Sequence, residues 1–209
     1  MNDCLPPVGL RLHARARHVP GVVLLLLANA LLCGVLSRTV EVYLDPDAIT
    51  PLVALCPLLA AAALGAATLE PLPEIAPTTA RSGPLLRLGL YLALALAGAA
   101  LLSLVTPAGE RGAASYGPGV MARNTLGVAG LCAASAVVLG ARLSWLPVLG
   151  YGAAVFLGGR TPRPYATTTR VWAWLDQPVG DRLALALALA LFLAGGALFV
   201  AKGARAERA

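Results

Sequence analysis

The sequence predicts an all-α protein: a polytopic transmembrane helical bundle of about six spans. Six stretches of 17 to 22 residues contain no charged side chain, and the charged residues gather in the segments between them. Apolar residues make up 58% of the chain, charged residues only 12%, and the mean hydropathy is +0.78. About 20 helical residues cross a hydrocarbon core about 30 Å thick, whereas helices of a water-soluble protein carry a polar face. These observations exclude an ordinary soluble domain and a disordered chain.

The predicted transmembrane domain is a single unit that covers residues 19–201. Leu and Ala dominate it, as in the alternating run 183–191. Both are strong helix formers, and an alternation without polar partners makes no amphipathic strand, so this run is predicted to be helical. The alternating polar and apolar segments of a transmembrane β-barrel are not found in the sequence. The predicted spans are 19–37, 48–69, 88–109, 124–141, 143–159 and 183–201.

Residues 1–18 form a basic segment before the first span. It contains Arg11, Arg15 and Arg17 among apolar residues, and we expect it to lie at the cytoplasmic membrane surface as an interfacial helix. Basic residues beside a first span favour a cytoplasmic N-terminus. The apolar run continues to Leu36, which favours a retained helix over a cleaved signal peptide.

Six crossings return the C-terminal tail, residues 202–209, to the cytoplasm. The sequence therefore predicts a multi-pass protein of the plasma membrane with both termini inside. In this scheme Arg123 belongs to the extracytoplasmic loop before the fourth span. The fifth apolar run contains Pro147 and four glycines, so it is either a kinked crossing or a re-entrant segment.

Two predicted loops carry the candidate interaction residues. The cytoplasmic loop after the second span contains Glu70 and Glu74, and the prolines between them favour a docking or solvated role over cation binding. The extracytoplasmic connection before the sixth span contains Tyr165, Trp172 and Trp174. Such aromatic residues typically mark the membrane–water interface, and contact with a substrate is the alternative.

The predicted spans contain few polar groups and no ionisable side chain near their centres. For Asn29, a hydrogen bond to a neighbouring helix is favoured over a substrate contact. The four cysteines are far apart in sequence without a CxxC motif, so we expect packing residues and neither a redox pair nor a zinc site. No catalytic motif, cofactor motif or metal cluster is found, and the scattered basic residues form no nucleic-acid-binding face. An enzyme and a self-powered ion-coupled carrier are therefore not predicted.

The layout of the whole chain resembles the membrane subunits of ABC-2-like exporters, especially small permease-like proteins of actinobacteria. The residues that carry the resemblance are Ala122-Arg-Asn-Thr-Leu-Gly127 at the start of the fourth span and Trp172-Ala-Trp174 before the sixth. The resemblance implies that the loop between the second and third spans contacts a separate cytoplasmic ATPase. The residues implied in this docking are Glu70, Glu74, Arg81 and Arg87.

We therefore expect a permease-type subunit of an ATP-driven exporter, which forms part of the translocation path in membrane lipid with another membrane subunit or a second copy. The alternative is a non-transporting scaffold or immunity-type protein that stabilises a partner through small-residue helix faces. A third hypothesis is a lipid-modifying enzyme that binds phosphate headgroups through Arg160, Arg163 and Arg170. This last hypothesis lacks a base or a nucleophile.

Overall fold

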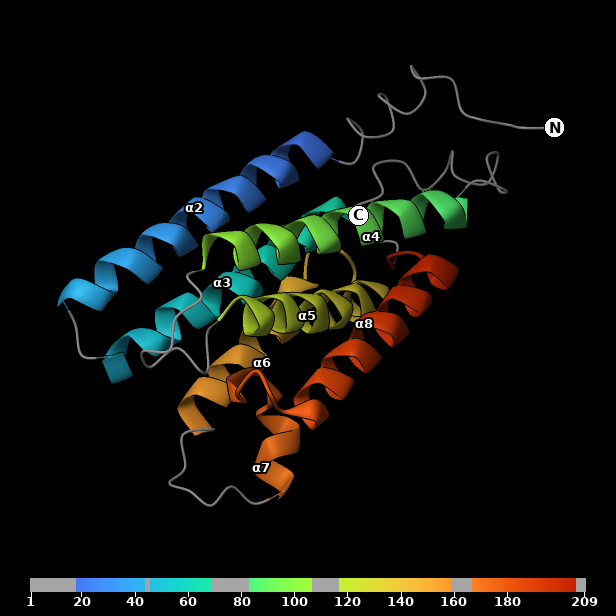
Figure 1. Cartoon of the computed structure of the whole chain (residues 1–209). Coiled ribbons are helices and arrows are strands. Elements are labelled where there is room, and N and C mark those ends of the chain that lie inside the picture. The colour runs from blue at the N-terminus through green and yellow to red at the C-terminus, as the bar shows by residue number, and fades with distance from the viewer. Residues whose placement is uncertain (1–17, 44–45, 69–82, 107–116, 159–166, 206–209) are drawn as a thin grey trace.

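The computed structural model describes residues 18–43, 46–68, 83–106, 117–158 and 167–205, with the side chains of 39–43, 46–51 and 167 left out. Within these ranges the chain is all-helical, as the sequence predicts (Figure 1). The predicted interfacial segment falls almost entirely outside the described residues. The helices are α2 (Val19–Tyr43), α3 (Pro46–Ala67), α4 (Gly83–Val105), α5 (Pro118–Leu139), α6 (Trp145–Gly158), α7 (Thr167–Trp172), the 3₁₀ turn η3 (Trp174–Asp176) and α8 (Arg182–Lys202).

Helix α5 is the central helix of the bundle, and α3, α4, α6 and α8 pack against it. Within its candidate span 61% of the residues are buried, against 28% in α2 and 33% in both α4 and α8. Its mean hydropathy of 1.4 is nevertheless the lowest of the four, below 2.4, 2.3 and 2.6 for the others. The most buried helix is thus the most polar, because its polar side chains meet protein while the outer helices meet lipid.

The closest helix contact is the crossing of α5 and α8. A Cβ atom placed on Gly195 would lie 2.0 Å from the carbonyl oxygen of Gly130, and one on Gly130 would lie 2.2 Å from the carbonyl oxygen of Leu191. Only residues without a side chain fit at this crossing, because these neighbouring atoms belong to the backbone. The two glycines therefore determine how closely α5 and α8 approach.

Contacts along the helices fix their relative directions. Gly98 of α4 lies against Leu26 of α2, and Val105 lies against Gly34, so α2 and α4 run parallel. Helix α3 connects to the far end of α2 and runs back beside it (Figure 1).

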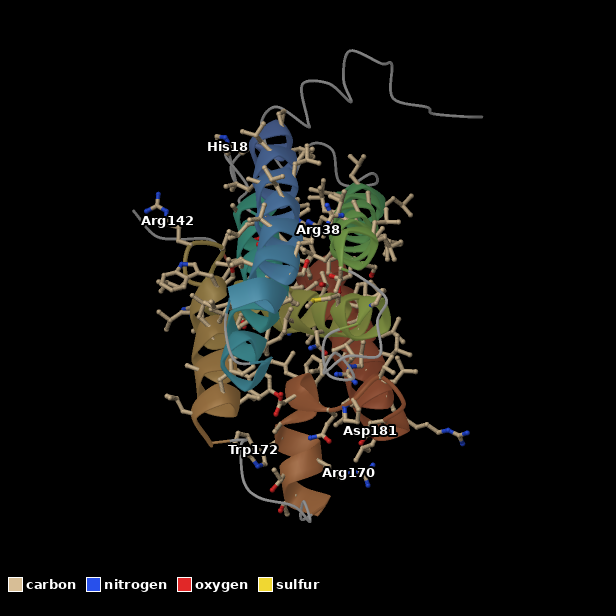
Figure 2. The ribbon with its side chains drawn as sticks, turned by 60° about the vertical axis from the view of Figure 1, so that its left-hand side comes forward. His18, Arg38, Arg142, Arg170, Trp172 and Asp181 are labelled. Atoms are coloured by element: carbon tan, nitrogen blue, oxygen red, sulfur yellow. The ribbon has the colours of Figure 1, made fainter. Side chains whose placement is uncertain are left out.

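Helix α8 runs parallel to α5 and antiparallel to α4. The backbone N–H of Arg205 donates to the carbonyl oxygen of Ala136 near the end of α5, at 3.0 Å. The guanidinium of Arg87, near the start of α4, lies beside Gly203 just after α8. The start of α2, the start of α4 and the end of α8 therefore share one end of the bundle, which we call the basic end, defined by Arg87, Arg142, Lys202 and Arg205. Figure 2 places Arg142 and His18 away from Arg170, Trp172 and Asp181, which lie at the opposite end.

Four of the helices are long and apolar enough to cross a membrane: α2 over Val19–Arg38, and the whole of α4, α5 and α8. The described apolar part of α3, Leu52–Ala67, and helix α6 are shorter. At about 1.5 Å per residue, the 14 residues of α6 extend roughly 21 Å, less than a hydrocarbon core of about 30 Å. The alternating directions agree with the predicted order of crossings, but a count of six spans remains a prediction.

The outer faces of the long helices are apolar. Leu24 and Leu31 of α2 are 71% and 70% exposed, Leu104 of α4 is 82% exposed, and Leu193 of α8 is 66% exposed. Side chains of this size on several neighbouring helices would be costly in water and are the normal contact surface with lipid tails. The chain is therefore suited to a membrane, as the sequence predicts.

Candidate functional site

The most unusual side chain of the described structure is Arg123, which is buried in the first part of α5 with only 4% of its surface exposed. The sequence pattern places this residue in a loop before the fourth span, and that placement is wrong. Helix α5 begins at Pro118, directly after Gly117, because proline is well suited to the first turn of a helix, where its missing N–H is not needed. The earlier start puts Arg123 inside the helix and in contact with the interior.

The guanidinium of Arg123 is held by backbone carbonyl groups of the α7–α8 connection, residues 173–181. Its Nη2 donates to the carbonyl oxygen of Gln177 at 2.7 Å and, over a longer 3.5 Å, to that of Leu175. Its Nη1 donates to the carbonyl oxygen of Pro178 at 3.0 Å. An arginine stays charged in proteins, so its burial is tolerated only when its donors are bonded. Arg123 meets that condition by donating hydrogen bonds to the backbone carbonyl groups of a turn.

Asn124 extends the same network. Its Oδ1 accepts a hydrogen bond from Arg123 Nε at 3.0 Å, and its Nδ2 donates to the carbonyl oxygen of Leu175 at 2.8 Å. Gln177 is itself only 4% exposed, and its Nε2 donates to the carbonyl oxygen of Ala173 at 3.3 Å. The polar atoms of a turn next to the membrane are thus bonded by side chains of α5, as the low polarity of the surroundings requires.

Trp174 fixes the α7–α8 connection from its apolar side. It is 3% exposed, and its ring stacks on Tyr151 of α6 with centroids 6.2 Å apart. Gly127 of α5 leaves the space for this ring, since a Cβ atom there would lie 2.3 Å from the indole Cη2. Trp174 is therefore a buried packing residue that joins η3 to α5 and α6.

Asp181 fixes the connection at the start of α8. Its Oδ1 accepts hydrogen bonds from the backbone N–H groups of Leu183 and Ala184 at 2.8 and 3.1 Å, which makes it the N-cap of α8. Its Oδ2 pairs with Arg170 of α7 at 2.7 Å. Burial raises the pKa of this carboxyl group, but the hydrogen bonds from Arg170 and from the two amides outweigh it and lower the pKa below its ordinary value.

Together, Arg123, Trp174 and Asp181 anchor the connection to three different helices. The Asp181 carboxylate also attracts the Arg123 charge, although no hydrogen bond joins them. Each of the three side-chain nitrogens of Arg123 and each carboxylate oxygen of Asp181 is hydrogen-bonded within the protein. Chemically, the arrangement positions a chain segment at the end of the bundle opposite the basic end. It offers neither a free nucleophile nor a base to a substrate.

The other residues selected from the sequence lie in different places. Trp172, at the end of α7, is 38% exposed, and its backbone oxygen accepts a hydrogen bond from the Tyr151 hydroxyl at 2.5 Å. Arg87 lies in α4 at the basic end, beside Gly203. The remaining candidates, Glu70, Glu74, Arg81, Tyr165, Arg160 and Arg163, lie outside the described residues. The loop proposed for ATPase docking is therefore not described as a unit.

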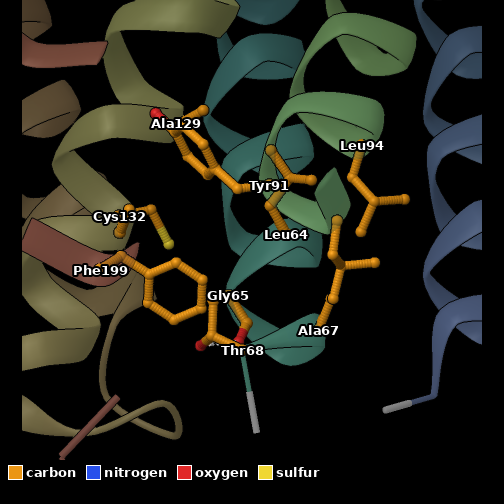
Figure 3. A pocket seen from close by; sticks show the side chains of 11 residues that line it. Leu64, Gly65, Ala67, Thr68, Tyr91, Leu94, Ala129, Cys132 and Phe199 are labelled. Carbon is orange, nitrogen blue, oxygen red and sulfur yellow. Dashed lines mark hydrogen bonds between the residues drawn. The ribbon is translucent and has the colours of Figure 1, made fainter. Parts of the chain in front are cut away.

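A small cavity lies between α3, α4, α5 and α8 (Figure 3). Its volume is about 20 Å³, room for about one water molecule. The polar groups on its wall are bonded within the protein: the Tyr91 hydroxyl donates to the carbonyl oxygen of Phe192 at 2.8 Å, and Thr68 Oγ1 donates to that of Gly65 at 2.7 Å. Small-molecule sites commonly measure roughly 300–1,000 Å³, so this cavity is no substrate site as it stands.

The sequence does not reveal the network around Arg123, because an uncharged run ends at any arginine. Gly117 and Pro118 are a helix-start signal that was available in the sequence. With the helix begun there, Arg123 and Asn124 fall within its first two turns. The partners could not have been found, because they are backbone atoms some fifty residues later.

Comparisons of the chain with models of known protein families, with curated proteins and with solved structures find no match.

Proposed function

We propose that this chain is a permease-type membrane subunit of an ATP-driven exporter, which forms part of a translocation path and docks a separate cytoplasmic ABC ATPase. The observation that carries the proposal is how the buried charge of Arg123 is bonded. Arg123 is bonded to backbone carbonyl groups and to Asn124, so its charge holds structure in place. An ion-coupled carrier needs ionisable groups that load and release their ion. A transporter built this way takes its energy from outside, which an ATPase would supply.

The proposed docking surface is the basic end of the bundle together with the loop that contains Glu70, Glu74 and Arg81. The described residues place Arg87, Arg142, Lys202 and Arg205 at this end and Arg38, Arg123, Arg170 and Arg182 at the opposite end, so their number alone does not orient the chain. The basic segment 1–18 precedes α2, and basic residues beside a first span favour the end at which α2 starts as the cytoplasmic one. In this orientation both described ends of the chain face the ATPase.

Copurification from the native membrane tests the proposal. The tagged chain should bring down an ATPase, and the purified chain alone should hydrolyse no ATP. The double variant Glu70→Ala/Glu74→Ala should reduce the recovered ATPase. The matched control is Arg182→Ala, an exposed charge at the opposite end, which should leave recovery unchanged. A stable native complex without an ATPase contradicts the proposal.

The second candidate is a non-transporting scaffold that stabilises a partner, and one observation favours it. Among the described residues, Gly130 and Gly195 bring α5 and α8 into backbone contact, and the cavity between α3, α4, α5 and α8 measures about 20 Å³, room for about one water molecule. Copurification distinguishes the two. A scaffold should recover a membrane partner in constant ratio without an ATPase, and loss of the chain should lower the partner's abundance.

A further inference from the structure

Helix α6 is the shortest of the described helices that run between the two ends of the bundle. Its 14 residues extend roughly 21 Å, whereas the candidate spans in α2, α4, α5 and α8 have 20 to 23 residues and extend roughly 30–35 Å. It begins after the α5–α6 turn, which contains Arg142 of the basic end, and it ends at Gly158, beside the ring of Trp172. Figure 2 places Arg142 and Trp172 far apart, so the two ends of α6 belong to opposite ends of the bundle.

Close packing against α3 fixes the height of α6 in the bundle. A Cβ atom on Gly152 of α6 would collide with the Leu58 side chain of α3, and one on Gly65 of α3 would collide with the hydroxyl of Ser144, just before α6. Gly65 and Leu58 are seven residues apart, and Ser144 and Gly152 are eight apart, so the two helices run antiparallel with nearly equal rise. Helix α6 therefore starts beside Gly65 and cannot slide along α3 without a clash.

One face of α6 is packed and the other is open. The buried positions follow a helical spacing: Val148, Gly152 and Val155. The exposed positions follow the same spacing on the opposite side and form what we call the open face of α6: Leu146, Gly150, Ala153 and Leu157. Leu146 is 52% exposed, and Leu157, at 88%, is the most exposed large apolar side chain that the structure describes. The open face is apolar along its whole length, as a surface in contact with lipid tails is.

A tryptophan and an arginine lie at each end of α6. Trp145, its first residue, is 40% exposed, and Arg142, three residues earlier, is also exposed. Trp172, which packs on Gly158 at the other end, is 38% exposed, and the side chain of Arg170 two residues earlier is 46% exposed. Tryptophan is enriched at the level of the lipid headgroups, and an arginine is costly in hydrocarbon. The hydrocarbon layer beside α6 is therefore bounded by two polar levels that lie about one length of α6 apart.

Helix α4 has the usual length for a membrane span and lies on the other side of α5 (Figures 1 and 2). Its outward Leu85 and Leu104 are 72% and 82% exposed. These residues are 19 positions apart, which corresponds to about 29 Å of helix, close to a hydrocarbon core of about 30 Å. A layer of uniform thickness cannot fit α4 and also the roughly 21 Å of α6.

We propose that α6 crosses the membrane completely and that its open face thins the bilayer locally, to about the length of α6. A short apolar segment held between polar ends is accommodated in this way, because lipid tails deform more easily than a packed helix pair. We assign the open face to lipid and not to a second protein, because exposed tryptophans at both ends are the anchors of a lipid boundary. Local thinning lowers the cost of moving a charged or polar group through the layer, so this face is where the bundle eases such a passage. The inference does not depend on the proposed transport function.

Spin labels on exposed positions measure the thickness of the layer beside each helix. The full chain carries Cys4→Ser, since Cys33, Cys56 and Cys132 are buried, and is reconstituted into vesicles of dioleoylphosphatidylcholine. Single labels are placed at Leu146→Cys or Leu157→Cys, which are 11 positions apart on the open face of α6. A water-soluble nickel complex collides with labels near the surface of the layer, and dissolved oxygen collides most with labels in its interior.

The matched control is a pair on α4 with the same spacing, Leu85→Cys and Leu96→Cys, both exposed positions. In the control, the label at Leu85 should collide with the nickel complex several-fold more often than the label at Leu96. On α6, both labels should be as accessible to the nickel complex as the label at Leu85. Two labels about 16 Å apart in a layer of about 30 Å would instead leave at least one of them about 7 Å or more below the surface. A third label at Ala153→Cys, in the middle of the open face, should be shielded from the nickel complex and accessible to oxygen.

Three results would overturn the proposal. A label at Leu146 or Leu157 that is clearly less accessible to the nickel complex than the label at Leu85 shows a layer of ordinary thickness. A label at Ala153 that the nickel complex reaches freely shows that α6 lies outside the lipid. A label at Ala153 that is immobilised and shielded from both reagents shows that a second protein covers the open face.

Discussion

Replacement of Arg123 by methionine tests whether this side chain holds the α7–α8 connection. The substitution keeps an unbranched apolar stem and removes every donor. The backbone oxygen of Gln177 and the Oδ1 of Asn124, now bonded at 2.7 and 3.0 Å, would then lack their Arg123 partner. Each buried acceptor left without a partner costs about 1–3 kcal/mol. Two such acceptors predict a loss of about 2–6 kcal/mol in the free energy of unfolding, lessened because a buried charge is also removed.

Thermal unfolding in detergent measures the loss, and the fluorescence of Trp174 localises it. In a background with Trp145→Phe and Trp172→Phe, only the buried Trp174 remains to report on the connection. Arg123→Met should shift its emission to longer wavelength, since the connection separates from α5 and water reaches the indole. Arg123→Lys should fall between the two, because an ammonium replaces the fork of donors with a single charged group.

The matched control is Arg182→Met, which removes an exposed arginine from the start of α8. Exposed substitutions away from such networks typically change stability by less than about 0.5 kcal/mol. If Arg123→Met unfolds at the same temperature as this control and the Trp174 emission does not move, the reasoning about the buried arginine is refuted.

Further expectations concern the cap of α8, the α5–α8 crossing and the tryptophan. Asp181→Ala should cost about 0.5–2 kcal/mol as a lost N-cap. Because the pKa of Asp181 is lowered in the folded state, this carboxylate stabilises the fold fully at pH values above its unfolded pKa near 3.9, and the stabilisation is lost as the pH falls below that value. At pH values below about 4 the melting temperature of the parent should therefore decrease, and that of Asp181→Asn should decrease much less. An equal decrease in both contradicts this. Gly195→Ala should lower the free energy of unfolding by at least about 1–3 kcal/mol, because the added methyl group pushes α8 away from the backbone of Gly130. The control Gly150→Ala has open space around it and should be neutral or stabilising. Equal melting temperatures of the two variants would disprove the close crossing. Trp174→Ala should cost about 3–5 kcal/mol as a cavity in the core, measured by the same unfolding assay, and a change under 1 kcal/mol would contradict its packing role.

The helices themselves could be predicted from the sequence, because an uncharged run of sufficient length has few alternatives to a membrane-embedded helix. Helix α8 shows this well: the predicted span 183–201 differs from the observed Arg182–Lys202 by one residue at each end. Helix α5 is different, because it contains a charged residue near its start. A charge inside a helix looks like a helix boundary until its partners are known, so the sequence predicts a loop position for Arg123.

The role of the tryptophans could not be predicted for a similar reason. Trp172 and Trp174 are two residues apart and look alike in the sequence, yet the first is 38% exposed and the second 3%. The difference depends on Gly127 and Tyr151, which lie in other helices and provide space and a stacking surface for Trp174 alone.

The sequence by itself determined that the chain is helical and suited to lipid, since these properties follow from the length and composition of each segment taken separately. Only the tertiary structure decided which polar atoms meet: Arg123 with the carbonyl groups of a distant turn, and Asn29 of α2 with the backbone oxygen of Cys56 in α3. The physical reason is that helix propensity and hydropathy are properties of each segment and can be added up residue by residue, whereas a hydrogen bond depends on the separation of two atoms to within a few tenths of an ångström. That separation is set by how the helices pack, and the close approach at Gly130 and Gly195 is one of the contacts that set it.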